Sequence, residues 1–545
     1  MPREKTFNTA GPSKPELHYM IDPLARIDLP EVEALIAQER YFVLHAPRQT
    51  GKTTCLLALM NHLNREGRYR ALYANIEVAQ TARGNVAEGI GAVLTALYEA
   101  ARLYLGESRG QAWAHAARAN DDPHTWLQRW LTEFSLADPD RPVVLLLDEV
   151  DALVGDTLVS LLRQLRAGYT QRPRAFPQSV ILCGVRDVRD YRIHTPGQEV
   201  ITGGSAFNIK AESLRLGNFT FDETKALWLQ HTEATGQRFD DAIWEPLWLD
   251  TEGQPWLVNA LGHECTWKDK TLRADRTAPV TLERYQLARE RLIQSRATHL
   301  DQLADKLSEP RVHRVIAAIL ESEADPAALS EEIAPDDLQY VYDLGLIAVR
   351  PMVRISNRIY REVIPRELTW TKQVYITHET AWYVDPATHR LQIPKLLTAF
   401  QEFFREHSDA WLQGFSYREA GPQLLLQAFL QRIVNGGGRI NREYGLGRKR
   451  TDLLIEWPLD PDQGLLGPKQ KGVIECKLVR NGKNPDAVVA EGIAQVADYA
   501  DRAGAEAAYL VVFDRRDAIP WEARIWQREY PWPGKPGQTI GVWGM

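Results

Sequence analysis

Short apolar runs alternate with stretches of helical spacing in the N-terminal part of the chain. The runs cover Tyr41–His45, Ala71–Glu77, Val143–Leu147 and Ser179–Arg186. Runs of this length are typical of strands that are buried on both faces of a parallel sheet. Because helical spacing follows the first run from Lys52 onward, the pattern predicts a doubly wound α/β sheet.

The middle of the chain has few strand signals. Amphipathic spacing across Phe219–Glu264 predicts a helical segment. Arg311–Leu320 and Pro335–Leu344 are predicted helices, and Gly345–Val349 with Val353–Ser356 is a predicted short hairpin. Two helices and a hairpin in this order resemble a winged helix.

Strand signals dominate the C-terminal part, where the predicted order is αβββαβ. The predicted elements are a helix over Tyr417–Val434 that ends at Gly436–Gly438, strands over Arg439–Tyr444, Asp452–Trp457 and Gly472–Leu478, a helix over Ala487–Ala503 and a strand over Ala507–Phe513. The preceding stretch, Glu367–Leu391, has some strand character and is predicted to be a connecting segment.

A phosphate-binding loop follows the first apolar run. It consists of Ala46, Pro47, Arg48, Gln49, Thr50, Gly51, Lys52 and Thr53, and Thr54 comes next. This is the P-loop pattern with Ala46 in place of the first glycine, at a position that needs a small residue. Backbone N–H groups at the helix N-terminus cradle phosphates, Lys52 neutralises the β and γ oxygens, and the Thr53 hydroxyl is a magnesium ligand. The loop predicts binding of ATP with Mg²⁺.

Two carboxylates, Asp148 and Glu149, end the apolar run that begins at Val143. This is a Walker B pattern. Asp148 is predicted to hold magnesium through water, and Glu149 to orient or deprotonate the attacking water, which leaves phosphoryl transfer mainly to positioning and electrostatics. An acidic strand end at the protein surface is the alternative interpretation.

Residues 17–366 resemble the archaeal-type and STAND branches of the P-loop ATPases related to AAA proteins. The resemblance includes the stretch CGVRDVRDY, in which Arg186 matches a phosphate-sensing position, and Gly253-Gln254-Pro255, which matches a lid motif near the nucleotide. It implies that the segment HYMIDPLARID lies on the adenine side, where Arg26 either contacts the base or forms a structural ion pair. A winged helix in this family either binds DNA, closes over the nucleotide or passes the nucleotide state onward.

A second group of charged residues lies in the predicted C-terminal strands. Asp452 begins one strand, and Glu475, Cys476 and Lys477 lie within the next. Because strand residues alternate between faces, Glu475 and Lys477 are predicted to share a face from which Cys476 points away. Asp452 and Glu475 can hold one or two Mg²⁺ ions, or Mn²⁺, supported by the Cys476 carbonyl, and Lys477 can position the metal-bound hydroxide. A salt-bridged sheet edge is the alternative interpretation.

Residues 400–515 resemble the PD-(D/E)XK nuclease superfamily, with Thr451 where the family usually has proline. Gln495 and Tyr499 match its QxxxY accessory motif, so both are expected to face the strands one helical turn apart. The resemblance implies a catalytic set of Asp452, Glu475, Lys477 and Gln495. Glu419 or Glu443 could add another carboxylate to the metal site, but packing or solvent exposure is the simpler explanation of each.

Basic residues gather near Asp452 in the sequence. They are Arg439, Arg442, Arg448, Lys449 and Arg450. These residues are candidate phosphate contacts, and a solvated loop is the alternative. Since no aromatic platform or base-reading motif accompanies them, we expect recognition of backbone and shape rather than of base sequence.

Overall charge and cysteine content bound the class of protein. The formal net charge is −7, so affinity for nucleic acid must come from local basic clusters. The four cysteines lie far apart without a CxxC pair, which argues against disulfides and structural zinc. The N-terminal sequence lacks a signal peptide core, and no apolar run approaches the roughly 20 residues that span a bilayer. We expect a cytoplasmic protein without membrane contact.

At 545 residues the chain is expected to form several domains. The predicted boundaries are 1–30 for an N-terminal segment, 31–205 for a P-loop ATPase core, 206–300 for a helical lid, 301–370 for a winged helix, 371–400 for a connector and 401–545 for a nuclease-like domain.

Together these features predict an ATP-regulated, magnesium-dependent endonuclease that acts on DNA rather than RNA. Restriction-like or antiphage defence is the setting that the combination suggests by analogy. The alternative is a nucleotide-dependent switch or scaffold that binds nucleic acid or a protein partner without cutting. A translocating motor is disfavoured because helicase motifs are not visible. Hydrolysis in this class often uses an arginine from a neighbouring subunit, so homo-oligomers are expected, with Arg163, Arg166, Arg172 and Arg174 as candidates.

Overall fold

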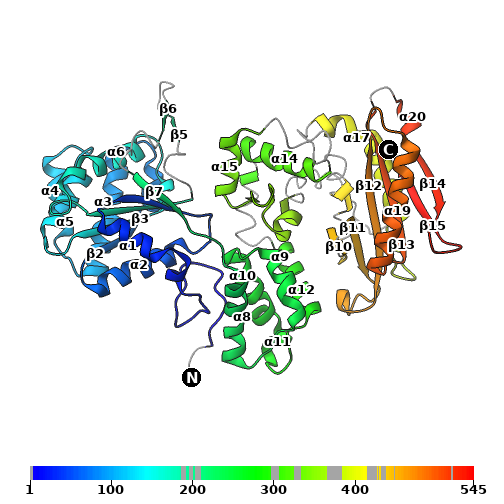
Figure 1. Cartoon of the computed structure of the whole chain (residues 1–545), viewed down its shortest axis with the longest axis horizontal. Coiled ribbons are helices and arrows are strands. Elements are labelled where there is room, and N and C mark those ends of the chain that lie inside the picture. Colours follow the sequence, from blue (N-terminus) through cyan, green and yellow to red (C-terminus); the bar gives the residue numbers. More distant parts are fainter. Residues whose placement is uncertain are drawn as a thin grey trace. The chain divides into compact units, whose positions relative to one another are not determined.

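The computed structural model describes most of the chain, which divides into two compact units. The described residues are 4–185, 192–194, 200–202, 210–295, 306–307, 309–324, 333–364, 383–413, 426–427, 429–430, 437–446, 449–516 and 519–545. The first unit comprises Met1–Leu292 with Gln339–Ala348, and the second comprises Ile293–Leu338 with Val349–Met545. Figure 1 labels their helices and strands. Among the described residues, no helix combines the length and apolar character that crossing a bilayer requires.

A five-stranded parallel sheet forms the centre of the first unit. Its strands are β1 (Tyr41–His45), β2 (Arg70–Asn75), β3 (Val143–Asp148), β4 (Ser179–Gly184) and β7 (Lys210–Arg215), in the order β2-β3-β4-β1-β7. All neighbouring strands run parallel. Strands β1, β3 and β4 are buried along their whole length. This burial explains why they occur in the sequence as continuous apolar runs.

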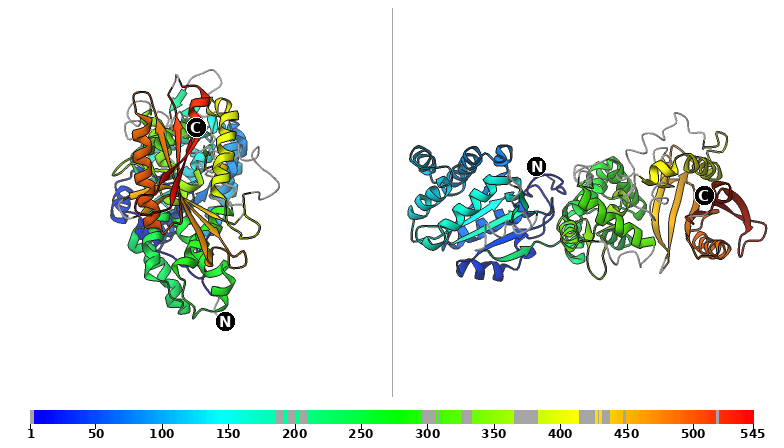
Figure 2. Two further views of the ribbon diagram at one scale, coloured as in Figure 1. Left: turned by 90° about the vertical axis from the view of Figure 1, so that its right-hand side faces the viewer. Right: turned by 90° about the horizontal axis from the view of Figure 1, so that it is seen from above.

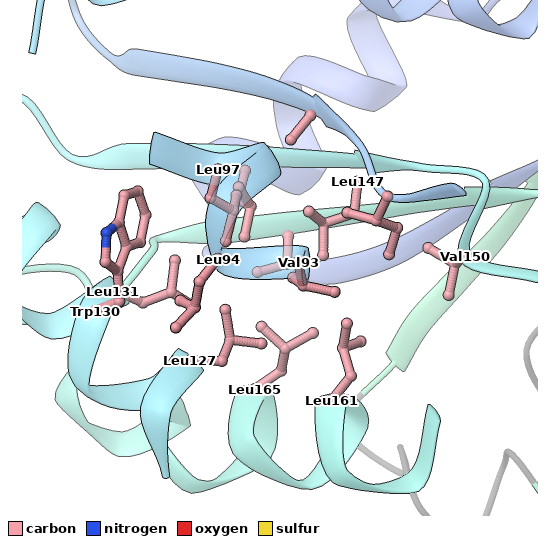
Figure 3. Close-up of a cluster of buried hydrophobic side chains, with 14 of the residues drawn as sticks. Val93, Leu94, Leu97, Leu127, Trp130, Leu131, Leu147, Val150, Leu161 and Leu165 are labelled. Carbon is pink, nitrogen blue, oxygen red and sulfur yellow. The ribbon is translucent and has the colours of Figure 1, made fainter. Parts of the chain in front are cut away.

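Helices cover both faces of this sheet. One layer contains α1 (Leu29–Ala37) and α2 (Lys52–Glu66), and the other contains α3 (Val86–Leu105), α4 (Gly110–Asn120), α5 (Trp126–Leu136) and α6 (Gly155–Ala167). Figure 3 shows the second layer, in which Leu94, Leu131 and Leu165 gather with other apolar side chains against the sheet. The three layers confirm the predicted doubly wound α/β sheet.

The rest of the first unit is mainly helical, as the pattern over Phe219–Glu264 predicts. Its helices are α8 (Phe221–Thr235), α9 (Trp244–Thr251), α10 (Pro255–His263), α11 (Lys270–Ala274) and α12 (Leu282–Gln294). The N-terminal segment packs on them: Phe7 is 2% exposed, and its ring centroid lies 5.8 Å from that of Trp228. Trp256 also donates its indole N–H to the Thr9 carbonyl at 3.0 Å. The N-terminal segment is thus part of the packed unit.

The described residues also form several short elements. They are 3₁₀ helices over Pro23–Arg26, Glu77–Ala82, Val150–Ala152, Tyr169–Gln171, Asp241–Ile243 and Gly464–Leu466, a π-helix over Glu264–Lys268, and the strand pair β5 (Arg192–His194) and β6 (Val200–Thr202). In the predicted winged-helix region the elements are α14 (Pro310–Ala324), α15 (Pro335–Asp343), β8 (Ile347–Ala348) and β9 (Arg354–Ile355). The predicted elements are present, and their assembly into a winged helix stays a prediction.

A six-stranded mixed sheet forms the centre of the C-terminal part. Its strands are β10 (Arg439–Leu446), β11 (Lys449–Pro458), β12 (Lys469–Val479), β13 (Ala507–Asp514), β14 (Trp526–Pro531) and β15 (Thr539–Gly544), in the order β10-β11-β12-β13-β15-β14. The pairs β12–β13 and β13–β15 are parallel, and the other three pairs are antiparallel. The sequence pattern does not predict β14, β15 or the short helix α20 (Trp521–Arg524). No residue of β14 is fully buried, so this edge strand lacks an apolar signal.

Among the described residues, helices pack on both faces of the C-terminal sheet. Figure 2 shows α19 (Pro485–Ala503, orange) and α17 (Ile393–Gln413, yellow) on opposite sides of the strands. Helix α17 is not predicted from the sequence, and it crosses the predicted boundary at 401; Leu396 and Phe400 of this helix are fully buried in the sheet's core. We therefore propose that this domain begins no later than Tyr383, which belongs to the same core. Most of the helix predicted over Tyr417–Val434 lies outside the described residues.

A buried ion pair joins β10 and β11. Arg439 and Glu456 lie opposite each other and are 7% and 4% exposed. The Nε atom of Arg439 donates to Glu456 Oε2 at 2.6 Å, and Asn441 donates to the same oxygen at 3.1 Å. Although burial opposes ionisation, Arg439 and Lys469 hold the pKa of Glu456 below its usual value. The prediction that Arg439 contacts phosphate is therefore wrong, because its guanidinium is enclosed by the sheet and paired with a carboxylate.

Candidate functional site

The phosphate-binding loop joins β1 to α2. Gln49 and Gly51 have positive φ angles of 57° and 88°, and the Thr50 hydroxyl donates to the Pro47 carbonyl at 2.7 Å. These turns wrap the loop around the first turn of α2. No side chain of the described residues caps α2. Its first N–H groups can therefore hold phosphate oxygens.

Lys52 points back into the loop. Its ammonium donates to the carbonyl oxygens of Ala46 and Pro47, both at 3.0 Å, and the residue is 6% exposed. A buried ammonium needs strong acceptors because burial removes its hydration. Phosphate oxygens are stronger acceptors than carbonyls. The position of Lys52 therefore suits neutralisation of a phosphate chain held by the loop.

Strand order brings the two nucleotide motifs together. Val43 of β1 and Leu147 of β3 lie level with the same residue of β4, Leu182. The carboxyl ends of β1 and β3 therefore meet at one edge of the sheet, where the Thr53 hydroxyl donates to Asp148 Oδ2 at 2.7 Å. The Thr53 hydroxyl and the Asp148 carboxylate fit a magnesium ion as ligands, since magnesium prefers hydroxyl, carboxylate and water oxygens.

Tyr73 belongs to this site and is not predicted from the sequence. Its hydroxyl donates to Asp148 Oδ2 at 3.0 Å from the neighbouring strand β2. Burial, together with the Asp148 charge, raises the pKa of Tyr73 above its usual value. Tyr73 thus stays a donor and fixes the orientation of the carboxylate. A tyrosine among the apolar residues Ala71, Leu72 and Ala74 was the available signal.

Glu149 occupies a strained position beside this carboxylate. Its φ angle is 59°, which is unfavourable for a residue with a side chain, and its N–H donates to Asp148 Oδ1 at 3.0 Å. Burial raises the pKa of Glu149, while the Lys52 charge lowers it and the nearby carboxylates raise it further. A carboxylate with a raised pKa next to a phosphate site suits proton abstraction from water.

A pocket lies beside the phosphate-binding loop and reaches the helical part of the first unit. It contains about 700 Å³ of empty space, part of which is open solvent. Its walls come from three parts of the first unit: the N-terminal segment supplies Asn8, Thr9, Gly11, Tyr19 and Arg26; the loop region supplies Gln49, Thr50, Gly51 and Thr54; the helical part supplies Phe219, Pro255, Trp256 and Asn259. Its position beside the loop suits the base and sugar of a nucleotide whose phosphates the loop holds. Residues near the N-terminus thus form one wall of the pocket, whereas the sequence motifs indicated chiefly the loop.

The residues predicted to lie near the nucleotide differ in where the structure places them. Pro255 lines the pocket, next to the helix start that the resemblance placed near the nucleotide. Arg26 also lines the pocket, but its guanidinium is held by backbone carbonyls rather than by a carboxylate among the described residues. Base contact and ion pair therefore both stay predictions for Arg26. Arg186 lies outside the described residues.

Arg172 is unsuitable as an arginine supplied to a neighbouring subunit. Its side chain donates to the carbonyls of Tyr169 and Glu39 within the same chain, and its guanidinium lies 3.4 Å from the Tyr169 ring centroid. This prediction is wrong because these contacts fix the side chain internally. Arg163, Arg166 and Arg174 are exposed and stay predictions.

The alternation predicted for β12 matches the packing. Cys476 is 6% exposed in the core under α17, whereas Val473 and Val479 belong to the core under α19. Glu475 and Lys477 share the strand parity of those valines and so lie on the α19 side. Tyr499 of α19 packs in the same layer.

Four polar residues form a cluster between β12 and α19. Lys477 Nζ lies 3.6 Å from Glu475 Oε1 and 3.5 Å from Glu491 Oε1. Gln495 donates to Glu491 Oε1 at 3.3 Å. Glu491 is missed by the sequence interpretation, and its only signal was its place one helical turn before Gln495. The structure therefore brings Glu475, Lys477 and Gln495 into one cluster through Glu491.

Other residues predicted for this site are beyond what the structure describes. The side chains of Thr451, Asp452, Arg442, Glu443, Lys449 and Arg450 are not described, and neither are Glu419 and Arg448. The backbone of residue 452 is described. It precedes Leu453, which pairs with Ile474, the residue before Glu475.

Comparisons with known proteins identify the N-terminal region. Residues 36–191 match the model of a family described as AAA domain. This region is an ATP-binding P-loop ATPase of the AAA type. The match includes both nucleotide motifs, from Ala46 to Glu149. No curated protein matches the chain.

Three solved structures are similar to part of the chain. The Walker-type ATPase of Pyrococcus abyssi is 15% identical, with 66% of this chain and 99% of that chain covered and a TM-score of 0.43. For the ORC2 protein of Aeropyrum pernix the identity is 15%, the coverage is 65% and 96%, and the TM-score is 0.38. For Cdc6p of Pyrobaculum aerophilum the values are 14%, 64% and 93%, and 0.34.

Proposed function

We propose that the chain is an ATP-regulated, Mg²⁺-dependent nuclease that cuts DNA. The carrying observation is the cluster of Glu475, Lys477, Glu491 and Gln495 at the edge of an apolar layer, where Glu475 is buried and Glu491 is exposed. Glu475 is 5% exposed, and a carboxylate buried to that degree lowers stability unless ions or hydrogen bonds offset its desolvation. Charged groups retained at such a cost are candidates for a functional site.

The course of the backbone supports Asp452 as the second metal ligand. In antiparallel strands, the residues next to an opposed pair also lie opposite each other. Since Leu453 pairs with Ile474, the neighbouring positions 452 and 475 meet at the same place along β11 and β12. Asp452 also shares the strand parity of Leu454, which packs in the layer under α19. Two carboxylates at these positions would suit one or two Mg²⁺ or Mn²⁺ ions, which generate a hydroxide nucleophile when bound.

Lys477 would stabilise charge that develops on the phosphodiester. Its ammonium lies between two carboxylates, which keeps it close to Glu475. Gln495 would hold Glu491 and so fix the other side of the ammonium. In the ATPase region, Thr53 and Asp148 would hold the Mg²⁺ of the nucleotide, and Lys52 would neutralise its phosphates.

Cleavage of DNA by the full chain tests this proposal. Duplex DNA, single-stranded DNA and RNA are incubated with Mg²⁺ or Mn²⁺, with and without ATP. We expect DNA cleavage that Asp452→Ala and Glu475→Ala abolish and that Lys477→Met slows by about 10²–10³-fold, the usual effect of losing one group that stabilises transition-state charge. Lys52→Ala is expected to remove the effect of ATP on cleavage while leaving the metal-dependent chemistry.

Asp501→Ala is the matched control, since Asp501 is an exposed carboxylate on the same helix as Gln495. It should cut DNA at the wild-type rate. Cleavage that persists in both Asp452→Ala and Glu475→Ala contradicts the nuclease assignment. Binding of nucleic acid without cleavage under every metal and nucleotide condition would instead support the switch or scaffold alternative.

A further inference from the structure

Arg26 lies where three parts of the first unit meet. It ends the 3₁₀ helix Pro23–Arg26, whose first turn is capped by the Asp22 carboxylate. Its Nη1 donates to the Thr50 carbonyl of the phosphate loop at 2.6 Å, and its Nη2 donates to the Gly217 carbonyl at 2.5 Å. A guanidinium can grip two carbonyls at once because its donors form a rigid planar fork.

The loop side of this contact is closely fitted. Gly51 has φ of 88°, and a Cβ atom built on it would lie 3.0 Å from Arg26 Nη1. The guanidinium therefore occupies the space beside the glycine that starts α2. Any movement of the Thr50–Gly51 peptide on phosphate binding must change the contact with Arg26.

The other side of Arg26 leads to the helical part. Its guanidinium carbon lies 4.8 Å from the centroid of the Phe219 ring, within range of a cation–π contact. Phe219 donates its N–H to the Gly253 carbonyl at 2.9 Å, and a Cβ atom on Gly253 would lie 1.9 Å from the Phe219 carbonyl oxygen. Gly253 and Gln254 directly precede α10, and Gln254 caps that helix.

These contacts form a continuous path between two walls of one pocket. Thr50 and Gly51 line the pocket at the loop, while Pro255 and Asn259 of α10 line it at the helices. Arg26 touches the loop at Thr50 and the segment Gly217–Phe219, and Phe219 in turn contacts Gly253, just before α10. Coupling between such sites requires a physical connection whose arrangement both sites influence.

We propose that Arg26 is a positioning residue that couples occupancy of the phosphate loop to the placement of α10 and its neighbouring helices. A nucleoside triphosphate fixes the Thr50–Gly51 backbone, Arg26 follows the Thr50 carbonyl, and Gly217 with Phe219 follows Arg26. The inference depends on the ATP-binding region and not on the proposed cutting of DNA.

The test uses the full chain with a non-hydrolysable ATP analogue. Hydrogen exchange is followed over 46–54 and over 217–263 in the wild type, Arg26→Met and Arg26→Lys. In the wild type the analogue should protect both segments. In Arg26→Met it should protect 46–54 only and bind about 5- to 150-fold more weakly, the usual range for a coupling between sites. Arg26→Lys should recover part of the coupling, because an ammonium keeps the charge and loses the fork.

Two further variants keep the test decisive. Phe219→Leu removes the ring contact and leaves the phosphate loop unchanged, so it should weaken protection of 217–263 even if Arg26→Met does not fold. Arg102→Met is the control, because Arg102 is exposed on α3 and pairs with Glu99. Wild-type protection of 217–263 in Arg26→Lys and Phe219→Leu would overturn the proposal. So would an Arg26→Lys variant that loses protection of both segments before the analogue is added, since that marks a purely structural role.

Discussion

Replacing Glu149 by glutamine should slow ATP turnover by about 10²–10⁴-fold, the usual contribution of a positioned general base. ATP binding should persist, because glutamine keeps the side-chain shape and the contacts of Lys52 with the loop do not involve Glu149. Steady-state hydrolysis and equilibrium binding of ATP, measured on the same samples, separate the two effects.

The decrease of ATP turnover at low pH should follow the protonation of Glu149. Burial raises the pKa of Glu149 above 4.5, the ordinary value of a glutamate. Only the ionised form can accept a proton, so turnover should fall as pH decreases through this raised pKa, at a higher pH than an ordinary glutamate would give. The residual activity of Glu149→Gln should lack this decrease in a pH–rate profile.

The raised pKa of Glu149 also changes how the free energy of unfolding depends on pH. The folded protein favours protonated Glu149 more than the unfolded chain does, so ionisation of Glu149 lowers the free energy of unfolding as pH rises from 4.5 through the folded-state pKa. Without nucleotide, Glu149→Gln should therefore melt at a higher temperature than the wild type at neutral pH, and the difference should shrink in acid.

Glu233→Gln is the matched control for these measurements, since it makes the same chemical change at an exposed glutamate of α8 in the same unit. It should leave turnover, its pH profile and the melting temperature near wild-type values. If Glu149→Gln hydrolyses ATP as fast as Glu233→Gln, Glu149 is not the catalytic base.

Replacing Arg439 by alanine should destabilise the C-terminal sheet by about 3–5 kcal/mol, because the change leaves a buried carboxylate without its main partner. Glu456 is 4% exposed, so water cannot easily replace the guanidinium. Lys469, with its ammonium 3.6 Å from Glu456, and Asn441 compensate in part, which favours the lower end of the range. Native-state hydrogen exchange of a peptide covering β10 and β11 in increasing urea measures this loss.

The stability lost in Arg439→Ala should depend on pH. In the wild type the lowered pKa of Glu456 contributes stability above the ordinary glutamate pKa, and this stability is lost as pH falls through the folded-state pKa. Without Arg439, the same carboxylate favours its protonated form. The difference between variant and wild type should therefore be largest near neutral pH and should decrease in acid.

Two controls identify the mechanism. A double variant, Arg439→Met with Glu456→Leu, should recover most of the stability, because a buried ion pair is often replaceable by apolar residues of similar volume. Arg102→Ala removes an arginine from an exposed pair and should cost less than about 1 kcal/mol. An equal effect of Arg439→Ala and Arg102→Ala would show that the Arg439 pair is not effectively buried.

The interactions of several functional residues lay beyond the reach of the sequence. Tyr73 meets Asp148 across 75 positions of chain, and Arg26 reaches Gly217 across 191. Contacts of that separation depend on strand order and on how segments pack, and a single sequence carries no local pattern for them. Arg439 illustrates the reverse error: a basic residue in a basic stretch predicts a phosphate contact, whereas its place opposite Glu456 in the sheet makes it structural.

The sequence by itself determined what is encoded in consecutive residues. The phosphate loop from Ala46 to Thr53, the carboxylates that end β3, and the alternation of Glu475, Cys476 and Lys477 all follow from local geometry, because strand and helix periods fix where neighbouring side chains point. Only the tertiary structure decided which distant segments complete each site. It gave the nucleotide pocket an N-terminal wall, placed α17 on the C-terminal sheet and brought Glu491 to Lys477. Those outcomes depend on the burial of apolar faces between distant elements, which no local pattern specifies.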